Sequence, residues 1–160
     1  MTNKGIAEIE LSEDFSNIKV AVIGALWNKE ICDSMIASAV ATLQEHDVKF
    51  QVFRVAGSFE LIAAAERAVA SGFEAVVMFG AIIRGETPHF EYLSQAVTQG
   101  AVALSLKGVA IGFGVLTCDN LTQAIERSGI AGAKEDKGKD TIEAVLLSLN
   151  TFQEMKIPRD

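Results

Sequence analysis

The sequence has few cysteines, prolines and histidines, and its aromatic residues are mostly phenylalanine. Its 160 residues include two of each of the first three, one tryptophan and one tyrosine. Cys32 and Cys118 lie far apart and form no CxxC pair. This excludes a disulfide framework and a zinc site, and it fits the reducing cytosol, so we expect a cytoplasmic protein without a metal.

Basic patches and long apolar runs are missing as well. The formal net charge is −7 and the pI is near 4.9, so an acidic surface would repel the phosphates of nucleic acid. The longest apolar stretches are far shorter than the ~20 residues needed to cross a bilayer. We therefore expect neither a nucleic-acid partner nor a membrane partner. The 49% hydrophobic content instead predicts a compact folded domain.

Apolar runs alternate with segments of helical length along the chain. The runs 19–26, 48–56, 75–83 and 108–117 are rich in Val, Ile and Phe on both faces, which is typical of buried parallel strands. Segments 28–46, 58–71 and 88–106 between them, and 120–127 and 140–152 after them, predict helices, with a loop at 131–139. The pattern predicts an α/β fold, an open and mostly parallel sheet with helices on both faces.

Two helix starts carry capping-box spacing, and the chain shows no internal boundary. Asn120 stands three residues before Gln123, and Asp140 three before Glu143. We expect an N-terminal arm over 1–16, a single domain over 17–154 and a tail over 155–160. The arm contains IAEIEL (6–11), which alternates like an edge strand.

Residues whose side chains can bind a ligand or transfer a proton follow three of the predicted strands. Trp27 and Asn28 follow the first, Ser58 to Glu60 the second, and the stretch GAIIRGETPHFEY (80–92) the third. In open parallel sheets ligands bind beyond the carboxyl ends of the strands. The placement therefore predicts one pocket with an aromatic wall, a carboxylate and a histidine.

The stretch 80–92 predicts both an anion site and a proton-transfer group. Thr87 and Pro88 suit the N-cap and first position of a helix, whose free amides favour an anion such as phosphate. His89 in the first turn is suited to proton transfer near neutral pH. Simpler interpretations stay open: His89 as a partly buried helix residue, Trp27 as core, and Glu60 as a complement to a helix dipole.

Five sequence blocks, in this order and spacing, resemble the lumazine synthases over about residues 17–150. The blocks are GSFEL (57–61), GAIIRGETPHFEY (80–92), FGVLT (113–117), QAIERSG (123–129) and DKG (136–138). The resemblance implies a flavodoxin-like three-layer sandwich with a four-stranded parallel sheet. It also implies that 5-amino-6-(D-ribitylamino)uracil and 3,4-dihydroxy-2-butanone 4-phosphate are condensed to 6,7-dimethyl-8-ribityllumazine in riboflavin biosynthesis, with no cofactor.

The resemblance assigns roles to matching residues. His89 would donate and accept protons, Arg127 would grip the phosphate and Lys137 would lie near it. The residues expected to bind substrate are Trp27, Asn28, Ser58, Phe59, Glu60, Ala81, Ile82, Ile83, Glu86, Thr87 and Phe113. Phe113, Arg127 and Lys137 would come from a neighbouring subunit, so the site would exist only in a homo-oligomer. The loop between Arg127 and Lys137 is longer than in relatives that form sixty-subunit shells, which favours a pentamer.

Departures from the family pattern and rival functions accompany this resemblance. Leu26 replaces a basic residue, Ile62 replaces a proline, and the Glu86 carboxylate must point away from a phosphate in the neighbouring turn. By the same resemblance, the strand predicted at 6–11 would pair with the adjacent subunit.

One alternative function is a riboflavin-binding or storage module without turnover. A flavodoxin-type electron carrier is the other, but GALWNKE lacks the hydroxyl-rich and glycine-rich phosphate loop it would need.

Overall fold

The computed structural model of the chain describes residues 10–11 and 14–156. Four parallel strands form one sheet in the order β2-β1-β3-β4. They are β1 (Lys19–Ala25), β2 (Lys49–Val55), β3 (Ala75–Ile83) and β4 (Ala110–Cys118). The predicted parallel sheet is confirmed.

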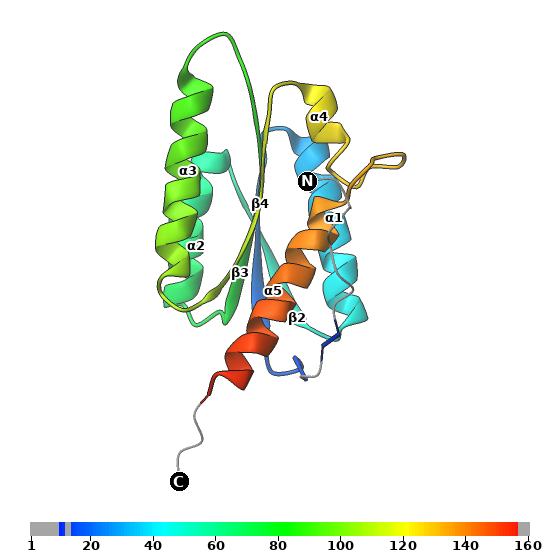
Figure 1. Cartoon of the computed structure of the whole chain (residues 1–160), viewed down its shortest axis with the longest axis vertical. Helices are drawn as coiled ribbons and strands as arrows, with labels where there is room; N and C mark the ends of the chain where they lie inside the picture. The colour runs from blue at the N-terminus through cyan, green and yellow to red at the C-terminus, as the bar shows by residue number, and fades with distance from the viewer. Residues whose placement is uncertain (1–9, 12–13, 157–160) are drawn as a thin grey trace.

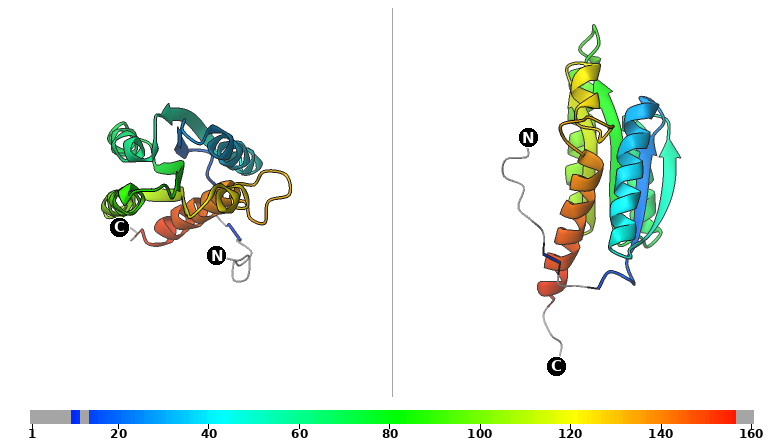
Figure 2. Two further views of the ribbon diagram at one scale, coloured as in Figure 1. Left: turned by 90° about the horizontal axis from the view of Figure 1, so that it is seen from above. Right: turned by 90° about the vertical axis from the view of Figure 1, so that its right-hand side faces the viewer.

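Helices cover both faces of the sheet (Figure 1, Figure 2). One face carries α1 (Lys29–Glu45), α4 (Leu121–Ile125) and α5 (Lys137–Glu154), and the other carries α2 (Ser58–Ala70) and α3 (His89–Ser105). Gly138 lets α5 approach α1 closely, since a Cβ there would lie 2.2 Å from the Met35 carbonyl oxygen. The helices and strands match the predicted α/β, flavodoxin-like arrangement.

Two apolar cores result from the alternation of side chains along the central strands. In β1, Val20 and Val22 join the core under α1 and α5, whereas Ala21 and Ile23 join the core under α2 and α3. Because helices cover both sides, β1 and β3 are apolar at nearly every position and almost wholly buried.

The prediction that all four strands are buried is wrong for β2. This strand lies at one edge of the sheet, and none of its residues is fully buried. Its sequence, KFQVFRV, has polar or charged residues at Lys49, Gln51 and Arg54. Those side chains reach solvent because an edge strand has only one neighbour and is less completely covered by the helices.

The start of α4 agrees with its predicted cap, whereas α5 begins earlier than expected. The Asn120 side chain accepts a hydrogen bond from the Gln123 backbone N–H at 2.9 Å. Asp136 does the same for Lys139 at 3.1 Å, so α5 starts at Lys137 and the proposed cap at Asp140 is wrong. The predicted loop at 131–139 is correspondingly shorter.

Two further predictions concern the chain termini and membranes. The edge strand predicted over 6–11 falls mostly outside the described residues, and Glu10 and Leu11, which are described, are not in a strand. Within the described residues, no helix combines the length and the apolar character that crossing a bilayer requires.

Candidate active site

A pocket lies beyond the carboxyl ends of two neighbouring strands whose following connections run in opposite directions. From the adjacent strands β1 and β3, the chain passes through α1 to β2 on one side and through α3 to β4 on the other. Parallel sheets bind ligands outside the strand ends at such a point. A cavity of about 520 Å³, called here the strand-end pocket, is found there. Its lining residues are Trp27, Asn28, Ser58, Phe59, Glu60, Ala81, Ile82, Ile83, Gly85, Thr87, His89, Phe90 and Leu93.

The turn between β1 and α1 brings Trp27 to the pocket. Asn28 adopts the left-handed conformation, with φ 55° and ψ 47°, and its side-chain amide donates a hydrogen bond to the Ala81 carbonyl at 2.8 Å. This bond ties the turn to the end of β3. Trp27 is 68% exposed, so its interpretation as a core residue is wrong.

The first turn of α2 supplies Ser58, Phe59 and Glu60. Ser58 is buried, while Phe59 is 64% exposed. One carboxylate oxygen of Glu60 accepts a hydrogen bond from the Gly57 backbone N–H at 3.0 Å. Glu60 thus stabilises the helix start, as the simpler interpretation held, and also lines the pocket.

His89 is the first residue of α3, one position later than predicted, with Pro88 as the cap. Its backbone N–H donates to the Thr87 hydroxyl at 3.4 Å. The side chain is exposed, and within the described residues the imidazole has no hydrogen-bond partner. An imidazole at the pocket wall without a competing partner can exchange a proton with a bound ligand.

Arg84 braces the segment that carries His89. It pairs with Glu91 and, at 2.9 Å, with Asp119, and its guanidinium lies 4.3 Å from the centre of the Phe90 ring. The hydrogen bond from Arg84 holds the pKa of the Glu91 carboxyl below its ordinary value. These contacts connect the end of β3 to the first turn of α3 and to the end of β4.

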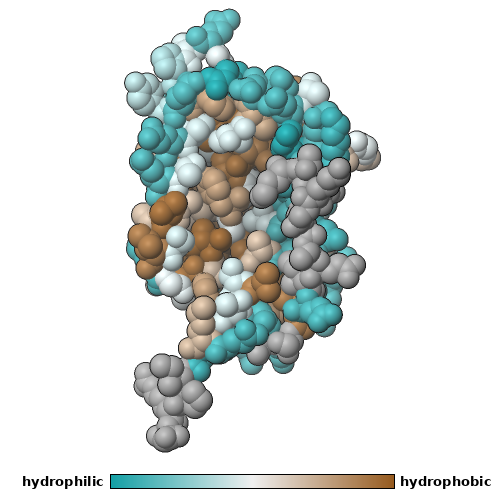
Figure 3. All heavy atoms as spheres, in the orientation of Figure 1, coloured by the Kyte–Doolittle hydropathy of each residue, from teal (hydrophilic) through white to brown (hydrophobic). Residues whose placement is uncertain are grey.

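Phe113, Arg127 and Lys137 line a different cavity. It measures about 800 Å³, runs beside β4 and α5, and is called here the β4 groove. Figure 3 shows apolar side chains gathered in the middle of the molecular surface that it draws, where β4 and α5 lie. The structure therefore separates these three residues from the strand-end pocket of the same chain, and Glu86, which is exposed, lines neither cavity.

Lys137 is held between two carboxylates at the start of α5. Its ammonium lies 2.7 Å from Glu135 and 3.0 Å from Asp140, and its side chain is 19% exposed. Burial lowers the pKa of Lys137, but the hydrogen bonds to both carboxylates raise it, with a net increase. Arg127 donates a hydrogen bond to the Gln123 carbonyl at 2.8 Å.

Sequence reasoning missed several lining residues. Gly85, Phe90 and Leu93 border the strand-end pocket. Leu93 follows His89 by four residues, a spacing that puts both on one helix face and could have indicated it. Glu135 was also missed, although the acidic residues beside Lys137 were a signal for its ion pair. No group of three His, Cys, Asp or Glu side chains suited to a metal occurs in the described part of the chain.

A parallel sheet with an aromatic ring, a carboxylate and an imidazole around its strand ends defines an α/β protein of the flavodoxin-like class with a small-molecule pocket. The family model described as 6,7-dimethyl-8-ribityllumazine synthase matches residues 17–153. The chain belongs to that family.

Curated relatives agree with this assignment over most of the chain. The 6,7-dimethyl-8-ribityllumazine synthase of Kineococcus radiotolerans is 46% identical over 94% of this chain and 92% of its own length. Those of a Nocardioides species and Streptomyces coelicolor are 42% and 39% identical, covering 89% and 99% of both chains, respectively. The predicted family and the prediction of an enzyme are confirmed, and the storage module is not favoured.

Proposed function

We propose that the chain condenses 5-amino-6-(D-ribitylamino)uracil with 3,4-dihydroxy-2-butanone 4-phosphate to 6,7-dimethyl-8-ribityllumazine, releasing phosphate and water. One observation carries the proposal for this chain. A single pocket at the strand ends brings together Trp27, Glu60 and His89, which come from three separate segments. Membership of the family supports the reaction.

The reaction requires positioning and proton transfer. An amine of the pyrimidine condenses with the ketone to an imine, phosphate leaves by β-elimination, and the second amine closes the ring with loss of water. His89 carries protons between these steps, and its unpartnered imidazole supports that role. Holding the two reactants together supplies much of the remaining acceleration.

The pyrimidine lies against Trp27, whose exposed indole supports a stacking role. Ser58, Phe59 and Glu60 receive the ribityl chain, and the backbone at 81–83 meets the ring. The Ala81 carbonyl, near the end of β3, accepts a hydrogen bond from the Asn28 side chain, which holds this segment beside the pocket.

The phosphate site is completed by Phe113, Arg127 and Lys137 of a neighbouring subunit, close to the turn at Glu86 and Thr87. Two facts support this arrangement. Among the described residues, the lining of the strand-end pocket contains no lysine or arginine, whereas Arg127 and Lys137 border the apolar β4 groove. A homo-oligomer, a pentamer by preference, would join the two surfaces. Cytoplasmic localisation stays a prediction.

One measurement tests the reaction and the assembly together. The purified protein is incubated with both substrates, lumazine absorbance and free phosphate are followed, and mass is determined by light scattering in the same sample. We expect equal amounts of lumazine and phosphate, produced by an oligomer. Tight riboflavin binding without product would favour the storage module instead, and full activity in a monomer would exclude the shared site.

A further inference from the structure

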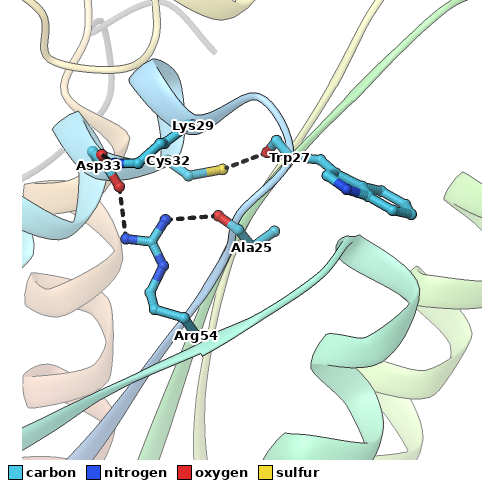
Figure 4. A network of polar contacts seen from close by, with 6 residues as sticks. All are labelled: Ala25, Trp27, Lys29, Cys32, Asp33 and Arg54. Carbon is cyan, nitrogen blue, oxygen red and sulfur yellow. Dashed lines mark hydrogen bonds and ion pairs between the residues drawn. The ribbon is translucent and has the colours of Figure 1, made fainter.

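The turn that carries Trp27 is anchored by a charged side chain from β2. Arg54 donates one hydrogen bond to Asp33 at 2.6 Å and another to the Ala25 carbonyl at 3.0 Å (Figure 4). Asp33 also pairs with Lys29, so the guanidinium joins the last residue of β1 to the first turns of α1. Its side chain is 28% exposed, which leaves the contact partly shielded from solvent.

The rest of the turn is fixed by backbone contacts. The N–H groups of Leu26 and Trp27 donate to the Ala56 carbonyl, at 3.1 and 3.0 Å. The Cys32 thiol donates to the Trp27 carbonyl at 3.5 Å. Burial raises the pKa of this thiol to about 11, so it keeps its proton at neutral pH. The backbone of Trp27 is therefore tied at both its N–H and its carbonyl.

The indole itself rests on a glycine. A Cβ at Gly57 would lie 2.5 Å from Cε3 and 2.7 Å from Cζ3 of Trp27, distances that no packed structure tolerates. Figure 4 shows the ring directed away from Arg54, toward the start of α2. The missing side chain at Gly57 thus provides the space that the ring occupies.

We propose that Arg54 and Gly57 are positioning residues that hold Trp27 ready to stack on an aromatic ligand, Arg54 by fixing the turn and Gly57 by seating the ring. An exposed side chain that is ordered before binding loses less entropy when the ligand arrives. The inference rests on the proposed function for its ligand, the pyrimidine, but the placement of the ring is testable without any ligand.

Trp27 is the only tryptophan, so the protein's indole fluorescence reports this residue alone. In Arg54→Ala and Gly57→Ala, we expect acrylamide to quench it more strongly than in the wild type and its anisotropy to fall. The KM for the pyrimidine should rise roughly threefold to tenfold, within the worth of a charge-assisted hydrogen bond, while kcat changes by less than about twofold. Arg54→Lys should show quenching and a KM between those of the wild type and Arg54→Ala, because an ammonium can pair with Asp33 without reproducing the bond to Ala25.

Arg67→Ala is the matched control. Arg67 is exposed near the end of α2, and its guanidinium makes no ion pair in the described part of the chain. We expect this variant to match the wild type in quenching and KM. Unchanged fluorescence in both Arg54→Ala and Gly57→Ala would overturn the proposal.

Trp27→Ala separates failure of the positioning from failure of the proposed function. If Trp27→Ala raises the KM for the pyrimidine and Arg54→Ala and Gly57→Ala do not, the positioning role is wrong. If Trp27→Ala itself leaves the KM unchanged, the stacking role of the proposed function is wrong, and the fluorescence alone then decides whether Arg54 and Gly57 hold the ring.

Discussion

The strand-end pocket and the β4 groove differ in their chemistry. The pocket offers an indole, a carboxylate and an imidazole, while the groove offers apolar side chains with Arg127 and Lys137 at its border. Among the described residues, the pocket lining contains an imidazole but no lysine or arginine, whereas the groove lining contains Arg127 and Lys137, together with carboxylates, but no imidazole. In the function proposed above, the two cavities are half-sites that complement each other across a subunit interface. The first three predictions below test these half-sites, and the last two test the stability of the elements next to the groove.

The largest expected effect is on turnover. His89→Ala should slow turnover by about 10²–10⁴-fold with little change in KM, because general acid–base catalysis is lost while the binding surfaces remain. Steady-state kinetics with both substrates measures this. His46, the other histidine, lies exposed beyond the end of α1 and serves as the control in His46→Ala. Wild-type turnover in His89→Ala would contradict the role.

Mixing two variants, each impaired in one half-site, tests whether the half-sites come from different subunits, provided that the butanone phosphate is kept well below its KM. Co-expressed His89→Ala and Arg127→Ala chains should regain about a quarter of the wild-type activity in mixed oligomers, because one interface in four combines two intact halves. Each variant alone supplies the baseline. If both halves belonged to one chain, no mixture could restore an intact site and activity would stay at the baseline.

Arg127→Ala should act mainly on binding. Loss of a charge-assisted contact to phosphate is expected to raise the KM for the butanone phosphate roughly tenfold to a hundredfold. The KM for the pyrimidine should change little, and the comparison of the two values is the measurement. Arg67→Ala controls for loss of an arginine elsewhere, and an equal change in both KM values would count against a phosphate role.

The cap of α5 should matter for stability rather than chemistry. Asp136 accepts hydrogen bonds from the Lys139 N–H and from the Ser38 hydroxyl, so Asp136→Ala should lower the free energy of unfolding by about 1–2 kcal/mol. Urea denaturation measures the change. Asn120→Ala, at the cap of the five-residue α4, is the comparison and should cost less. No loss of stability in Asp136→Ala would contradict a role for this cap in holding α5.

The smallest effect concerns the ion pair behind the β4 groove. The hydrogen bond from Lys137 holds the pKa of Glu135 below its ordinary value of 4.5. A depressed carboxyl pKa stabilises the fold above the unfolded pKa, and this contribution disappears as the pH falls through the folded value. Glu135→Gln should therefore have a lower free energy of unfolding than the wild type at neutral pH, and this difference should shrink as the pH falls below 4.5. A gap that persists in acid would exclude this linkage.

Much of the fold follows from the sequence because its central strands carry a strong pattern. The residues of β1 and β3 are apolar on both faces, which only a doubly covered parallel strand requires. The edge position of β2 was missed because Val52, Phe53 and Val55 look like core residues when pairing order is unknown. The N-cap of α5 was also ambiguous in sequence, because both Asp136 and Asp140 precede a helical pattern. Only the structure shows that Asp136 is the cap.

The site was partly predictable for a similar reason. Trp27, Glu60 and His89 were expected together because parallel strands end at one edge, and they line one pocket. The packing of the Trp27 ring against Gly57 could not be predicted from the sequence, because it depends on the distance between the turn after β1 and the turn after β2. The pairing of Lys137 with Glu135 depends likewise on how the chain bends between α4 and α5.

Asn28 limits how the mouth of the pocket can change in sequence. Most residues enter its backbone conformation at a cost of about 1–2 kcal/mol, whereas asparagine enters it more readily. Glycine would adopt this conformation without strain but would remove the side-chain amide that bonds to Ala81. Valine would be strained in this conformation and would also lack the hydrogen bond. An exposed position on a surface turn thus has very few acceptable occupants, and tolerance to substitution there should be far lower than its solvent exposure suggests.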